Sequence, residues 1–129
     1  MMITFRRRDA GSATVELALV LPLALFAALA LVQVGLLAKD SLKVANSARE
    51  GAREAAVSTD NARVRDAALR GGDLPEDRSI VAVERSGGLG APVTVTVIYR
   101  SPLVVPFVEW LFAEEVTIRS TASMRQETE

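Results

Sequence analysis

Residues 11–38 read GSATVELALVLPLALFAALALVQVGLLA, and this stretch decides how the chain is organised. It carries one charge, Glu16, near its beginning, and after that charge Gln33 is the only strongly polar residue. A helix over residues 17–38 is about 33 Å long at roughly 1.5 Å per residue, enough to cross a hydrocarbon core of about 30 Å. The stretch therefore predicts one transmembrane helix with its span at residues 17–38.

A removed secretory signal is the alternative interpretation of this stretch. The basic residues before it fit such a signal, but an h-region usually has only about 7–15 apolar residues. The nearest small-residue cleavage pattern, Ala28-Leu29-Ala30, lies in the middle of the run. A retained anchor is the better interpretation.

Basic residues before the span predict its orientation. Arg6, Arg7 and Arg8 precede it, and by the positive-inside rule they keep the N-terminus in the cytoplasm. Lys39 and Lys43 follow the span and weaken this asymmetry a little. We expect a single-pass protein of the inner (cytoplasmic) membrane whose C-terminal part is extracytoplasmic.

The composition narrows the chemistry open to the chain. It has no His and no Cys, which excludes the usual zinc and blue-copper ligand sets and every nucleophile that depends on a histidine. Lys and Arg number 15 against 16 Asp and Glu, a balance that gives no electrostatic footprint for nucleic acid. We expect no enzyme, no cofactor, no metal site and no nucleic-acid partner. A hydrolase that uses carboxylates alone has no supporting spacing.

Small residues continue the helix beyond the membrane. They recur every three or four positions and form one narrow stripe: Ser41, Ala45, Ala48, Ala52 and Ala55. We predict one helix over residues 12–57, then a short helix over residues 61–70 that starts at an N-cap cluster and is stopped by Gly71-Gly72.

The remaining sequence has the period of strands. Residues 79–85 and 116–124 are rich in β-formers or alternate in polarity, and Val93, Val95, Val97 and Tyr99 share one face of a third segment. An antiparallel three-stranded sheet needs cover on that face, and helix residues 40–57 are the nearest candidate. The predicted class is α+β, divided into a leader (1–11), a long helix (12–57) and a small extracytoplasmic head (58–129).

Glu16 stands at the entrance of the predicted span, where an acidic residue is unusual. A charge costs roughly 2.5–3.5 kcal/mol at the bilayer centre and less near its edge. Residues 12 and 16 are neighbours on one helix face. If the chain were cut after Gly11, the new α-amine of Ser12 would bring a positive charge beside Glu16. The alternative is an uncut helix whose Glu16 reaches the headgroups.

The N-terminal pattern resembles a known export signal. A short basic leader, Gly11, and Glu16 as the fifth residue after it, followed at once by an apolar helix, resemble the class III signal of type IV pilins and pseudopilins. More narrowly, residues 12–22 (SATVELALVLP) and 44–56 (VANSAREGAREAA) are similar to two stretches of TadE-like proteins.

This resemblance implies a pilin-like minor pseudopilin of the tight-adherence (Flp pilus) system. It implies that Gly11 and Ser12 flank a bond cut by a prepilin peptidase and that Glu16 aligns subunits during assembly. The implied partners are that peptidase, other pilin-like subunits, the membrane assembly platform and the lipid bilayer. Leu17 replaces a frequent aromatic and Ser12 a frequent Phe, departures that bear on methylation and filament packing more than on cleavage. The alternative is an uncleaved, single-span envelope protein with a partner-binding extracytoplasmic domain.

Three further features each have two interpretations. Pro22 predicts a helix kink, or is a proline tolerated within the membrane. Residues 103–112 hold Trp110 and two phenylalanines, which form either part of the core or a docking surface. Like charges four residues apart form two rows on the long helix, which either contact a neighbouring subunit or are solvated. The four residues in these rows that we name as a possible interface are Arg49, Glu50, Arg53 and Glu54.

Overall fold

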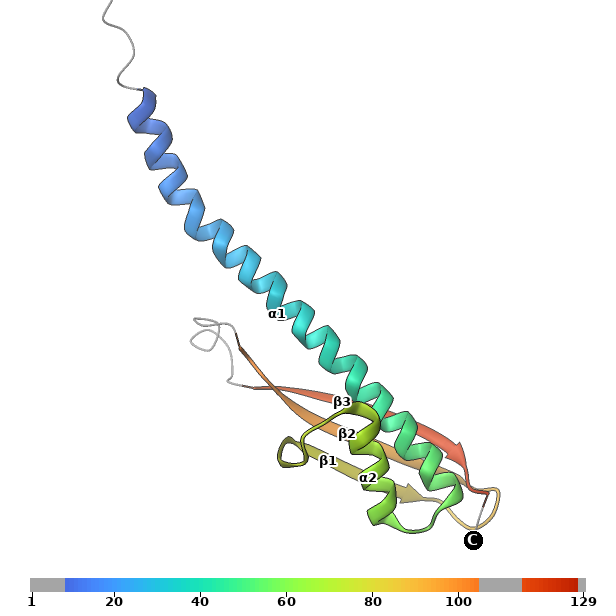
Figure 1. Ribbon diagram of the computed structural model, residues 1–129. Coiled ribbons are helices and arrows are strands. Elements are labelled where there is room, and N and C mark those ends of the chain that lie inside the picture. Colours follow the sequence, from blue (N-terminus) through green and yellow to red (C-terminus); the bar gives the residue numbers. More distant parts are fainter. Residues whose placement is uncertain (1–8, 105–114, 128–129) are drawn as a thin grey trace, which may run out of the picture.

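The computed structural model describes residues 9–104 and 115–127. Its elements in chain order are α1 (Asp9–Val57), α2 (Asn61–Gly72), a 3-10 turn η1 (Glu76–Arg78), β1 (Ser79–Arg85), β2 (Pro92–Pro102) and β3 (Glu115–Arg125). Figure 1 shows α1 as a long rod whose N-terminal part projects from a small head, while its C-terminal part lies along the sheet. The predicted α+β class is confirmed.

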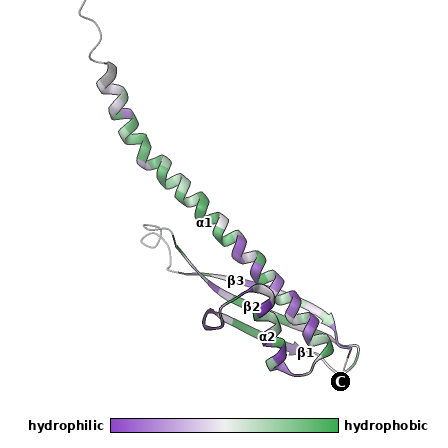
Figure 2. Ribbon diagram, in the orientation of Figure 1, coloured by the Kyte–Doolittle hydropathy of each residue, from purple (hydrophilic) through white to green (hydrophobic). Residues whose placement is uncertain are grey.

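Helix α1 is continuous over 49 residues. It begins three residues before the predicted start and ends at Val57, where we placed its end. Figure 2 shows that its projecting part is apolar and that polar residues become frequent where it reaches the head. One helix therefore joins the apolar segment and the head without a linker.

The sheet is an antiparallel meander in the order β1-β2-β3, as predicted. In its register Val95 pairs with Val83 on one side and with Ala122 on the other. Strand β2 starts at Pro92 and ends at Pro102, so its prolines lie at the strand ends, where a missing N–H disturbs the ladder least. On the outer face, hydroxyl pairs such as Thr96 with Thr121 (3.1 Å) join neighbouring strands.

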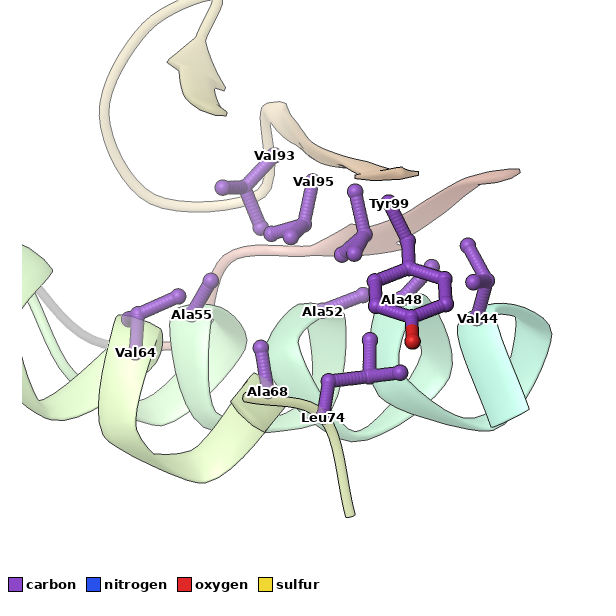
Figure 3. Packing of buried hydrophobic residues seen from close by; sticks show 11 residues of the cluster. Val44, Ala48, Ala52, Ala55, Val64, Ala68, Leu74, Val93, Val95 and Tyr99 are labelled. Atoms are coloured by element: carbon purple, nitrogen blue, oxygen red, sulfur yellow. The ribbon is translucent and has the colours of Figure 1, made fainter. Parts of the chain in front are cut away.

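The core lies between this sheet and the two helices. The predicted inner face is confirmed, because Val93, Val95 and Val97 are fully buried and Tyr99 is 8% exposed. Helix α1 lies against β2 and β3, and α2 contacts α1 and β1. Figure 3 shows the small side chains of α1 facing the β2 valines. The α1 and α2 members of the core are Val44, Ala48, Ala52, Ala55, Val64 and Ala68.

The end of α2 corrects one prediction. Gly71-Gly72 does not stop this helix; both glycines belong to its last turn, and Asp73 takes the left-handed conformation with φ 50°. A Cβ on Gly72 would lie 2.5 Å from the carbonyl oxygen of Lys43 and 2.7 Å from the Cβ of Ser47. Glycine is therefore needed here for close approach to α1 and not for its conformational freedom. The start of α2 is as predicted, with the Asp60 side chain accepting from the Ala62 N–H at 2.9 Å.

Two further contacts fix the C-terminal end of α1 to the sheet. The Arg85 guanidinium donates to the carbonyl oxygens of Ala55 and Ser58, each at 3.0 Å. The Glu127 N–H donates to the Ala56 carbonyl oxygen at 2.7 Å. The last carbonyls of a helix have no partner within it, so these donors complete the end of α1.

Candidate functional site

The candidate site is the first two turns of α1. Gly11, Ser12 and Glu16 all lie within the helix and are exposed. Among the described residues, no atom other than local backbone lies within 4 Å of a Cβ built on Gly11. Residues 12 and 16 are both helical, so their spacing places them on one side of α1. The Gly11–Ser12 bond is thus free of the head and close to the helix start.

A peptidase that cuts this bond must open the first helical turn. The first four N–H groups of any helix lack partners within it, so the end of a helix opens readily. Gly11 lowers the cost further, because glycine inside a helix is less favourable than alanine by about 1 kcal/mol. The geometry is compatible with cleavage after local unwinding. Arg6, Arg7 and Arg8 lie outside the described residues.

The next part of α1 presents large apolar side chains to its surroundings. Leu19, Leu23 and Leu31 are each 72–73% exposed. Exposed apolar side chains thus follow one another over several helical turns, and together they form a larger apolar patch than soluble monomers usually expose. In the described part of the chain α1 is the one helix long and apolar enough to cross a membrane. These properties are consistent with a membrane anchor.

Pro22 lies inside this exposed part. The helix continues through it, although its ring nitrogen leaves the carbonyl oxygen of Ala18 without the usual donor. Figure 1 shows a gradual curve along α1 and no break at a single turn. A kink at Pro22 during assembly stays a prediction.

The charged residues of the predicted interface divide between two roles. Glu54 pairs with Arg63 of α2 at 3.1 Å, so this carboxylate serves the chain's own helix pair. Arg53 lies 3.9 Å from Glu50 and its side chain is 75% exposed. Arg49 is exposed as well. The arginine row is thus available to a neighbour, and the interface stays a prediction.

The aromatic segment 103–112 falls mostly outside the described residues. Trp110 and both of its phenylalanines belong to residues 105–114, which the structure leaves undescribed. Of the two described positions, Leu103 is 6% exposed and Val104 is 64% exposed. Neither the core nor the docking interpretation of the aromatic residues is tested.

Sequence reasoning missed a second contact between α1 and the sheet. The Ser101 hydroxyl donates to the Asp40 carboxylate at 2.6 Å, and the Val104 N–H donates to the Gln33 side-chain oxygen at 3.1 Å. The chain at and just after the end of β2 therefore lies along α1 as far as Gln33, which is 5% exposed. The one signal in the sequence was the polar Gln33 within an apolar run.

Two titrating groups lie where α1 meets this end of β2. Burial raises the pKa of the Tyr99 hydroxyl, and the nearby Asp40 carboxylate raises it further. A hydrogen bond to Asp73 raises the pKa of Lys43, whose ammonium lies 3.0 Å from that carboxylate. Both effects favour the protonated form. Over the described ranges, no three His, Cys, Asp or Glu residues are grouped to hold a metal ion.

Comparison with known proteins gives one match. A family model described as TadE-like protein matches residues 11–53. The match begins at Gly11, covers the exposed apolar part of α1 and ends within the part that packs on the head. No curated protein and no solved structure matches the chain. The resemblance is therefore confirmed: over residues 11–53 the chain is similar to TadE-like proteins.

Proposed function

We propose that the chain is a minor pseudopilin, cleaved after Gly11 by a prepilin peptidase and needed to assemble a Flp-type adhesive pilus. The observation that carries this proposal is the order of two features in the first turns of α1. The family match begins at Gly11, and large exposed apolar side chains follow within a few residues, at Val15 and from Leu17 onward. The chain is a protease substrate and a structural subunit, and not itself an enzyme.

Cleavage would change the electrostatics of the helix end. It removes the basic leader and leaves an α-ammonium on Ser12, one helical turn from Glu16. A carboxylate at the membrane edge is costly when alone, and a positive partner offsets that cost. The partner is the chain's own amine or that of a neighbouring subunit. In the second case the pair fixes the axial position of one subunit against the next.

The continuity of α1 supports assembly as a rigid subunit. Residues 44–56 supply much of the helical side of the core, while residues 17–32 carry the exposed apolar surface. Both belong to one helix, so a force on the head acts directly on the membrane segment. Once the subunit leaves the bilayer, its apolar surface needs new cover, which the helices of other pilin-like subunits supply.

The test is the mass of the full-length protein recovered from membranes of cells with an active prepilin peptidase. We expect residues 12–129 in these cells, and an uncut chain when the peptidase is inactivated. Gly11→Leu should block cleavage. Gly35→Leu is the matched control, because none of the described residues outside the local helix comes within 4 Å of a Cβ built on either glycine.

An N-terminus at Met1 or Met2 in cells with active peptidase would defeat the pseudopilin mechanism. It would favour the uncleaved envelope protein instead. Loss of cleavage in both glycine variants would indicate a general defect of insertion and would remove the special role of Gly11.

A further inference from the structure

Val104, two residues beyond the end of β2, contacts the part of α1 that the sequence places inside the bilayer. Val104 donates its N–H to Gln33, and Gln33 lies within the span 17–38. Part of the head is therefore held beside the last turns of the apolar segment, although in sequence the head comes after that segment.

The charges on α1 locate this contact in depth. Glu16 and Lys39 are the charged residues that bound the apolar run, and they are about 35 Å apart along the helix at roughly 1.5 Å per residue. That separation matches a hydrocarbon core of about 30 Å with one charge at each edge. Gln33 lies about 9 Å before Lys39 on the same axis. A segment held to Gln33 is therefore below the outer headgroups.

The polar groups at this contact are arranged as an apolar environment requires. Backbone N–H groups in hydrocarbon need a partner, because no water is there to supply one. The Val104 N–H has its partner in the Gln33 side chain, and Gln33 is 5% exposed although Val32 and Val34 beside it are 56% and 63% exposed. The Gln33 amide is thus buried where Val104 contacts it, while Val104 itself is 64% exposed.

Charged groups appear again closer to the head. Ser101 contacts Asp40 at 2.6 Å, which places this hydrogen bond about 10 Å beyond Gln33 along α1. The residues next to this pair, Lys39 and Arg100, are exposed cations. They lie at the level of the lipid phosphates. Both α1 and the chain around the end of β2 are therefore apolar at the depth of the acyl chains and charged at the depth of the headgroups.

We propose that the chain just after β2, at Val104, is a membrane-inserted element of the head, with the Val104 side chain among the acyl chains of the outer leaflet. The ligand is the lipid hydrocarbon, and Gln33 is the positioning residue that satisfies the inserted backbone. The proposal holds whether or not the chain is cleaved after Gly11. It requires only that α1 span the bilayer.

The absence of cysteine makes a direct test possible. We would introduce Val104→Cys in the full chain, label it with an environment-sensitive nitrobenzoxadiazole dye, and reconstitute it at low protein density in phosphatidylethanolamine–phosphatidylglycerol vesicles. Lipids with a quencher on the acyl chain report contact with hydrocarbon, and aqueous iodide reports contact with water. Leu89→Cys is the matched control, because it is 59% exposed and lies in the β1–β2 turn at the opposite end of the sheet. Leu25→Cys, 59% exposed within the span, is the positive control.

We expect the dye at residue 104 to emit at shorter wavelength than at residue 89. It should lose emission to the lipid quencher, as at residue 25, and resist iodide. Adding Gln33→Leu should shift the residue-104 signal toward that of residue 89, with the circular dichroism of the head unchanged.

A water-like, iodide-quenched signal at residue 104 would overturn the proposal. If the dye at residue 25 were still quenched by the lipid quencher, that result would leave the interpretation of α1 as a membrane anchor intact. A blue-shifted signal that neither quencher reaches would also overturn it, because the side chain would then be covered by protein. No lipid quenching at residue 25 would overturn the anchor and the inserted element together.

Discussion

The two parts of α1 have opposite surfaces although they form one helix. Along residues 17–32 the large side chains are exposed, with Leu19 at 73%. Along residues 44–56 the small ones are buried, with Ala48 and Ala52 at 0%. Lipid chains adapt to any side-chain shape, so a span tolerates bulky leucines. A sheet and a second helix are rigid neighbours, so close approach to them needs alanine or glycine. Side-chain size along α1 is therefore consistent with lipid around the first part, and it fits the protein neighbours of the second part.

The sharpest test of this contrast uses two glycines of the same helix. A Cβ on Gly51 would lie 2.9 Å from the Ala68 Cβ and 3.0 Å from the Val95 Cγ1, whereas a Cβ on Gly35 would meet no other part of the described chain within 4 Å. We expect Gly51→Leu to lower the free energy of unfolding of the head by about 3 kcal/mol or more, because overpacking pushes both α2 and β2 away from α1. Gly35→Leu should change it by less than about 0.5 kcal/mol.

Urea unfolding in detergent micelles, followed by circular dichroism, would measure both glycine variants. Equal destabilisation by the two would show that the contrast between the parts of α1 is wrong.

The second-largest expected effect is that of alkaline pH, which should destabilise the head and leave the apolar part of α1 unchanged. The pKa of Tyr99 is raised by burial and that of Lys43 by its hydrogen bond to Asp73, so the folded head holds both protons above their ordinary values of about 10. Above that pH the unfolded chain binds fewer protons than the folded one, and the free energy of unfolding falls as pH rises. Residues 17–38 contain no titrating group and should not respond.

The measurement is urea unfolding at about pH 8 and about pH 11, and Tyr99→Phe should reduce the loss between them. A loss of the same size in Tyr99→Phe would mean that burial of the hydroxyl is not responsible.

The smallest effect should come from the ion pair between the helices. Glu54 and Arg63 are 3.1 Å apart, and the arginine side chain is 69% exposed. Glu54→Gln should therefore cost less than about 1 kcal/mol, and the difference should shrink as salt is added. Arg49→Gln, at an exposed position of the same helix, is the control for a change of one unit in net charge. A salt-independent cost above that range would show that Glu54 is more than a surface partner.

Local patterns in the sequence were enough to predict the elements of the fold. The alternation of Val93, Val95 and Val97 and the small-residue spacing at Ala48, Ala52 and Ala55 each state which side of an element is buried. The meander and its cover by α1 followed from these faces.

Contacts between distant segments were beyond those patterns. Gly71-Gly72 looks the same in sequence whether it ends a helix or lets two helices approach, and only the position of Ser47 distinguishes the two cases. Gln33 and Val104 are separated by 71 residues, so no local period links them. The candidate site at Gly11, Ser12 and Glu16 comes from the sequence alone and stays a prediction, to which the structure adds its exposure and helical state.

The two attachments of α1 have a consequence for orientation. Gln33 accepts from Val104, just after β2, and the Ala55 carbonyl oxygen accepts from Arg85 of β1 about 33 Å further along the helix. A helix held to the head at two such distant points cannot rotate about its own axis relative to the sheet. The direction in which the exposed leucines of α1 point is therefore fixed relative to the outer, hydroxyl-bearing face of the sheet. Any neighbour that aligns on the membrane segment meets the same side of the head every time.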